Sequence, residues 1–110
     1  DYSCYAGAGA FLSTPSDLVR LASAMVTPGL LKQETITLLQ TPLRLETGDS
    51  TGFTLGWKAE DVLLAGARTP LLIHRGTPVG GTIALMLFPE LRLVIATTSN
   101  VTPSSTGFDS

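Results

Sequence analysis

The only histidine of the chain, His74, follows a short apolar run and precedes a glycine by two positions. Residues 70–73 are expected to form a buried strand, and the glycines that follow His74 let a ligand approach the backbone closely. Imidazole accepts and donates protons near neutral pH, which suits general acid–base chemistry. The pattern therefore indicates a reaction site at the end of a strand, with a histidine that only satisfies a local hydrogen bond as the alternative.

The residues around His74 predict an antiparallel sheet. Two further apolar runs, 82–88 and 92–99, are separated by Pro89-Glu90-Leu91. Together with residues 70–73 they are typical of a three-strand meander. Residues 53–58 contain aromatic side chains and are expected to form a preceding strand.

A helix is predicted to begin at Thr14, with a hydroxyl cap, a proline at the first helical position and Asp17 at the third. Residues 27–29 contain proline and glycine and are expected to end it. One apolar face at helical spacing is formed by Leu18, Leu21, Ala22 and Met25.

Residues 34–40 predict a second short helix that turns Ile36 and Leu39 inward and stops before Pro42. Residues 43–52 are polar and predict a loop. The expected fold class is α+β: an antiparallel sheet, made of a three-strand meander plus a preceding strand, with two N-terminal helices.

Several segments between residues 4 and 100 resemble, in order, those of penicillin-binding proteins and class C β-lactamase-like serine hydrolases. His74-Arg75-Gly76 is similar to the His-x-Gly form of the third active-site motif of that family. The other matching segments are AGAGAFLSTPSDL (6–18), GLL with QET (29–31 and 33–35), LGW (55–57), LFPE (87–90) and SN (99–100). The resemblance implies a partial β-lactamase/transpeptidase-like fold over residues 1–100. Residues 101–110 are rich in serine, threonine and proline and predict a flexible tail, at a point where the family has a long C-terminal helix that packs on the sheet.

The resemblance also implies roles for four consecutive residues. His74 would lie beside a nucleophilic serine, stabilising charge and assisting proton transfer. Gly76 would leave room for a substrate to lie along the strand, and the N–H of Thr77 would be the second oxyanion-hole donor. Arg75 departs from the family, in which this position is small or hydroxylated, and either points to solvent or pairs with a substrate carboxylate.

Two motifs of the family are missing. No serine stands three positions before Lys32 or Lys58, so there is no Ser-x-x-Lys, and neither Tyr2 nor Tyr5 begins a Tyr-x-Asn. We therefore expect the C-terminal part of a larger hydrolase, inactive alone. The parent would be a β-lactamase, a D-Ala-D-Ala peptidase or an esterase, acting on a lactam, peptide or ester through an acyl-serine, and would be periplasmic or secreted. The alternative is a non-catalytic domain that binds a peptide or a protein partner on the same scaffold.

Ser50 and Cys4 are alternative nucleophiles within the chain. Residues 48–52 match Gly-x-Ser-x-Gly, and Ser50, Asp61 and His74 follow the Ser-Asp-His order of α/β hydrolases. The predicted context is a polar turn rather than a strand-to-helix elbow. Cys4 is the only cysteine, and the more usual role of a lone cysteine in an apolar segment is packing.

Composition limits the partners. A net charge of -2 with scattered arginines offers no basic field for nucleic acid. One cysteine and one histidine predict no metal site, and no cofactor is implied. No apolar run reaches the length of a membrane span. With 44% hydrophobic and only 15% charged residues, some apolar surface is expected to pack against sequence outside this chain. The resemblance implies a C-terminal helix on the sheet, and residues 102–110 lack helical apolar periodicity. Either that helix is supplied elsewhere, or the sheet face is uncovered, which would favour self-association.

Overall fold

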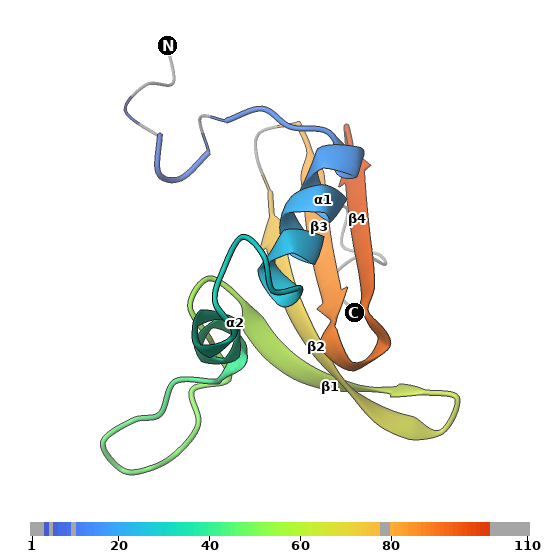
Figure 1. Cartoon of the computed structure of the whole chain (residues 1–110). Coiled ribbons are helices and arrows are strands. Elements are labelled where there is room, and N and C mark those ends of the chain that lie inside the picture. Colours follow the sequence, from blue (N-terminus) through green and yellow to red (C-terminus); the bar gives the residue numbers. More distant parts are fainter. Residues whose placement is uncertain (1–3, 5, 10, 78–79, 102–110) are drawn as a thin grey trace.

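The computed structural model describes residues 4, 6–9, 11–77 and 80–101. Two helices, α1 (Pro15–Val26) and α2 (Gln33–Gln40), precede four strands in the chain. The strands are β1 (Lys58–Leu64), β2 (Ala67–Gly76), β3 (Thr82–Phe88) and β4 (Leu93–Ser99), and a short 3₁₀ turn, η2 (Pro89–Leu91), joins the last two. In Figure 1, α1 lies against β3 and β4, whereas α2 lies apart from them. The α+β class predicted from the sequence is confirmed.

The sheet is an antiparallel meander with the strand order β1-β2-β3-β4. Leu64 pairs with Ala67 across the first hairpin, and Phe88 pairs with Leu93 across the last. The predicted meander over β2, β3 and β4 is therefore confirmed. Residues 102–110, which include nearly all of the expected tail, lie outside the described residues.

The two faces of the sheet carry separate clusters of buried residues, because side chains alternate along each strand. Leu72 and Leu87 are register partners and form one cluster with Ala22 of α1 and Trp57. The other cluster consists of Leu71, Ile73 and Phe88, with the half-buried Val62 and Met86 packed against it. Helix α1 thus covers β4 and part of β3 on the face that carries Leu72. Through Trp57, the same face also holds the segment before β1.

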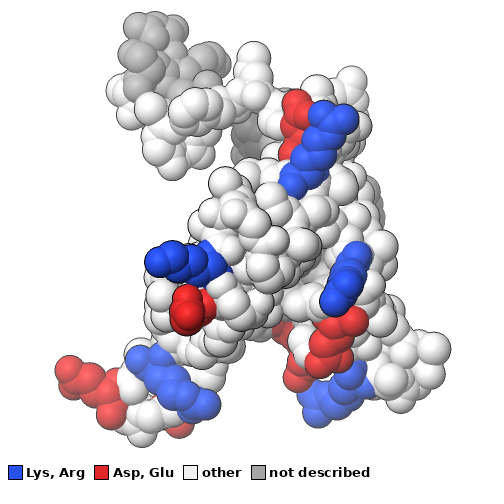
Figure 2. Space-filling view, viewed as in Figure 1, with Lys and Arg blue, Asp and Glu red and all other residues white. Residues whose placement is uncertain are grey.

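Charged side chains are distributed in small groups of both signs. Figure 2 shows positive and negative side chains next to each other in several separate places on this face. The described ion pairs are local: Asp17 with Arg20, Lys58 with Glu60, and Asp61 with Arg68. All three lie at the surface, where such pairs contribute little to stability.

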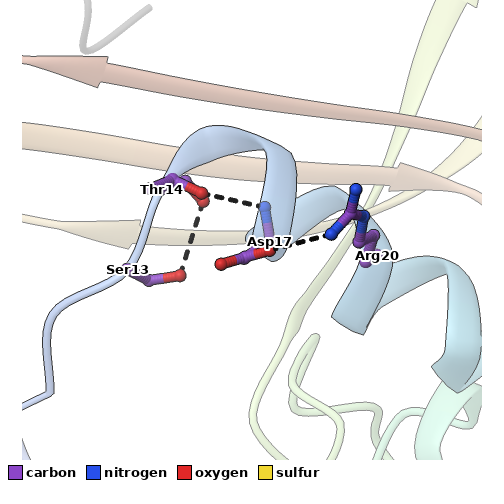
Figure 3. Close-up of polar contacts among 4 residues, drawn as sticks. All are labelled: Ser13, Thr14, Asp17 and Arg20. Atoms are coloured by element: carbon purple, nitrogen blue, oxygen red, sulfur yellow. Dashed lines mark hydrogen bonds and ion pairs between the residues drawn. The ribbon is translucent and has the colours of Figure 1, made fainter.

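Helix α1 begins as the sequence predicts. The side chain of Thr14 accepts a hydrogen bond from the backbone N–H of Asp17 over 3.2 Å, and Pro15 opens the first turn (Figure 3). The helix ends at Val26, immediately before the predicted stop. Its predicted apolar face is correct for Ala22, which is fully buried, but wrong for Leu21, whose exposed fraction is 52%. Leu21 has the right spacing, yet the sheet contacts only a narrow stripe of the helix.

Helix α2 starts one residue earlier than expected and buries Ile36. Leu39 is half-buried, and the helix ends at Gln40, before Pro42. The segment that follows is a loop, as predicted, closed by a single bridge between Arg44 and Ser50.

The strand expected at residues 53–58 is wrong: this segment is mostly a tight turn. Phe53 and Lys58 form one isolated antiparallel bridge, and the N–H of Thr54 donates to the carbonyl of Trp57 over 2.8 Å. Gly56 adopts a φ of 95°, a left-handed conformation that favours glycine. The strand that precedes the meander is instead β1, which begins only at Lys58.

Candidate functional site

His74 is held by the turn before β1. Its ring Nδ1 lies 2.9 Å from the carbonyl oxygen of Gly56. A carbonyl oxygen only accepts hydrogen bonds, so Nδ1 must carry a proton. In the neutral ring, Nε2 is then the unprotonated nitrogen and can accept a proton or a hydrogen bond. The contact thus selects one tautomer of an exposed imidazole.

The position of the Gly56 carbonyl follows from the packing of its neighbour. Trp57 is 7% exposed and belongs to the cluster that contains Leu72 and Leu87. Thr54 is also buried, and its N–H donates to the Trp57 carbonyl, which closes the turn. The burial of the Trp57 indole and the closed turn together hold the Gly56 carbonyl beside β2.

Beside His74 the sheet has an open notch. Strand β1 begins at Lys58, opposite Ile73, whereas β2 continues to its end with β3 as its neighbour on the other side. The N–H of Ala59 donates to the carbonyl oxygen of Gly52, on the side of β1 away from β2. Because backbone groups alternate in direction along a strand, the N–H and C=O of Lys58 point toward β2. By alternation, the N–H and C=O of Arg75 point to the same side as those of Ile73, where β1 has ended. An extended ligand could pair with them.

A hollow of about 380 Å³ lies in this notch. Its buried part consists of Thr54, Trp57 and Ile73, and its exposed rim is formed by Phe53, Gly56, Lys58, His74 and Arg75. The sequence pattern identified His74 and Arg75 but missed the six residues that complete the hollow. The sequence does carry a signal for them, Phe53 and Trp57 on either side of Thr-Leu-Gly, but the aromatic residues favour a strand when the sequence is considered alone.

The remaining predicted residues follow directly on the strand. A Cβ built at Gly76 would meet only the Cβ of Ile83, at 3.9 Å, which is ordinary contact. The described fold therefore does not itself require glycine at this position. Thr77 is exposed and comes immediately after β2. Pro78 and Val79 lie outside the described residues.

The three residues of the Ser-Asp-His alternative do not line one hollow. Ser50 and Asp61 line a second hollow, of about 400 Å³, whereas His74 lines the first. Ser50 accepts a hydrogen bond from the N–H of Gly52, and the next element after it is a strand. A nucleophile elbow requires a helix at that point. The geometry therefore gives this alternative no support.

Cys4 is exposed, so the expectation that it serves as a packing residue is wrong. Among the described residues, no three His, Cys, Asp or Glu side chains are grouped so that they could hold a metal ion. In the same part of the chain, no helix has both the length and the apolar character needed to cross a membrane.

We compared the chain with protein-family models, with curated proteins and with solved structures, and none of the three comparisons finds a match. The class that the structure defines is thus an α+β fold with two helices and a four-stranded antiparallel sheet. The candidate site is defined by its geometry: an oriented imidazole, an open strand side and a partly aromatic hollow.

Proposed function

We propose that this chain is the C-terminal part of a serine hydrolase of the β-lactamase and penicillin-binding-protein type, with β2 as one wall of its active site. The hydrogen bond from His74 Nδ1 to the Gly56 carbonyl carries the proposal. It leaves Nε2 of the neutral ring as a base at the end of a strand, next to a side open for substrate. The same hydrogen bond is also what the structural alternative for His74 predicts, so the labelling of His74→Ala described below is needed to separate the two roles.

In this proposal the nucleophile is a serine outside the chain. Its oxygen attacks the carbonyl carbon of an ester, amide or lactam, and the negative charge moves to the carbonyl oxygen. The N–H of Thr77 and that of the serine stabilise this oxyanion, and removing one such donor typically costs about 3 kcal/mol. The oxyanion then collapses, the bond between the carbonyl carbon and the leaving group breaks, and His74 assists transfer of the serine proton to the leaving group. Water then hydrolyses the acyl-serine and restores the serine hydroxyl. The isolated chain, with one of the two donors and no such serine, has no hydrolytic activity.

Gly76 and Arg75 support the binding of substrate in this arrangement. The backbone groups of Arg75 face the open side of β2, so an extended acyl chain can add there as a strand. The absence of a side chain at Gly76 keeps this approach clear, and no described contact of the fold explains that glycine.

A second candidate function rests on the same open strand side. A non-catalytic domain would use the N–H and C=O of Arg75 to bind an extended peptide or a protein partner, without any acyl transfer. Fold alone does not separate the two functions.

Covalent labelling tests the proposal. A fluorophosphonate is incubated with this chain and with the longer protein that contains it, and adducts are located by intact mass and peptide mapping. We expect no adduct on the chain, and in the longer protein an adduct on the serine of a Ser-x-x-Lys that forms more slowly in His74→Ala. A longer protein without that motif and without an adduct supports the binding domain. An adduct on Ser50 of the isolated chain would overturn both.

A further inference from the structure

The two hollows described above have linings of opposite charge. Lys58, His74 and Arg75 line the hollow beside β2, and none of its described lining residues is a carboxylate. Glu60, Asp61 and Glu90 line the second hollow, whose described lining contains no cationic side chain. The two volumes are nearly the same, about 380 and 400 Å³. Charge, rather than size, therefore distinguishes what each hollow accepts.

The volume and the lining of the first hollow suit a small aromatic ligand. Its volume lies within the range of about 300–1,000 Å³ that is usual for small-molecule sites. Trp57 and Ile73 are almost completely buried and belong to the clusters on opposite faces of the sheet, so the hollow lies at the sheet edge with one apolar residue from each face. Phe53, 54% exposed, lies at the rim. An aromatic ring in the hollow would gain apolar contact with Phe53 and with the small exposed part of Trp57.

Arg75 is the cation of this hollow that is best placed to bind an anion. Lys58 already pairs with Glu60, with 3.0 Å between Nζ and Oε1. Among the described residues, Arg75 takes part in no ion pair, and its side chain is exposed. A guanidinium offers two parallel N–H donors that match the two oxygens of a carboxylate.

We propose that this hollow binds a small aromatic carboxylate, with the carboxylate on Arg75 and the ring against Trp57 and Phe53. The inference names the ligand class of the proposed hydrolase site and rests on that function for its biological role. Binding itself needs no nucleophile, so the isolated chain is sufficient to measure it. Phe53, Trp57 and Arg75 thereby become determinants of specificity.

The test uses the only tryptophan of the chain. Its indole N–H gives a single NMR cross-peak, so a shift of that peak on titration reports occupancy of the hollow. The probe is 2-naphthoate, and 2-naphthamide is the uncharged probe of nearly the same shape. We expect saturable binding of 2-naphthoate, and binding of 2-naphthamide weaker by about tenfold, since hydrogen bonds to charged groups are the stronger ones.

Three substitutions of arginine separate the local contact from net charge. Arg75→Gln should weaken 2-naphthoate about tenfold and leave 2-naphthamide unchanged, and Arg75→Lys should fall between Arg75→Gln and the wild type. Arg68→Gln removes the same charge near the other end of β2, where the side chain is 79% exposed, and should bind like the wild type. The dispersion of the backbone amide peaks shows whether each variant is folded.

The proposal is overturned if both probes bind the wild type equally, or if Arg75→Gln and Arg68→Gln weaken 2-naphthoate to the same extent. It is also overturned if saturating 2-naphthoate does not move the Trp57 indole peak. None of these results bears on acyl transfer, which fluorophosphonate labelling of the longer protein tests separately. Labelling without naphthoate binding would reject only the ligand class, and binding without labelling would reject only the hydrolase.

Discussion

The imidazole of His74 is hydrogen-bonded to the backbone carbonyl of Gly56 over 2.9 Å, although 18 positions separate the two residues in the chain. We predict that the neutral side chain exists mainly as the Nδ1–H tautomer, because the carbonyl can only accept. Ring ¹⁵N chemical shifts of this single histidine, measured above the pH at which the ring loses its charge, identify the tautomer. A dominant Nε2–H form would contradict the assignment.

Gly56→Ala should disturb the same contact. The φ of Gly56 is 95°, which an L-residue adopts only with strain, so the turn should lose about 1–2 kcal/mol of stability. The Nδ1–H preference should weaken with it. Urea unfolding and the ring ¹⁵N shifts measure the two effects, and unchanged values for both would show that the turn does not orient His74.

Gly76→Ala is predicted to leave the fold intact and to affect only the function. The new Cβ would meet Ile83 at 3.9 Å and nothing closer, so the free energy of unfolding should change by less than about 0.5 kcal/mol. In the longer protein, labelling by the fluorophosphonate should slow, because the methyl group narrows the approach to β2. A loss of stability similar to that of Gly56→Ala would instead give Gly76 a structural role.

Thr14→Ala should destabilise α1 by about 1 kcal/mol, because its side chain caps the N–H of Asp17. Ser13→Ala is the matched control. The hydroxyl of Ser13 donates only to the carbonyl of Thr14, over 3.4 Å at the surface, so Ser13→Ala should cost little stability. Urea unfolding of both variants compares them, and equal losses would rule out the cap as the cause.

Leu87→Ala should be the most damaging apolar substitution. Leu87 is 1% exposed and contacts the cluster that joins α1 to the sheet, so truncation should cost about 2–5 kcal/mol. Leu91→Ala removes the same atoms at a position that is 53% exposed and should cost less than about 0.5 kcal/mol. Thermal unfolding by circular dichroism measures both, and similar Tm values would show that Leu87 is not at the centre of the core.

A substitution in the turn between β1 and β2 should raise the stability of the protein. Ala65 and Gly66 both have positive φ, 49° and 81°, as in the two-residue turns that favour Asn-Gly. Ala65→Asn should therefore stabilise the protein by about 0.5–1 kcal/mol. Ala67→Asn, one position into β2, introduces the same side chain without this benefit and should not stabilise. A higher urea midpoint for Ala65→Asn alone confirms the prediction.

Local sequence patterns are sufficient to predict the features that depend on near neighbours in the chain. The limits of α1 follow from Thr14, Pro15 and the residues after Val26, because caps, prolines and glycines act within one turn of the backbone. The strands of the meander follow from apolar runs of the right length. Their antiparallel order follows from short connections, which allow little else.

The candidate site, by contrast, depends on contacts between segments that are distant in the chain. Whether residues 53–58 extend or turn depends on the burial of Trp57 against Leu72 and Leu87, which come from distant strands. That turn places the Gly56 carbonyl on His74 and leaves β2 open beside Arg75. The packing of the chain also separates the residues of the Ser-Asp-His alternative: Ser50 and Asp61 line one hollow, and His74 lines the other. Contacts between distant segments depend on the packing of the whole chain, which local sequence patterns do not encode.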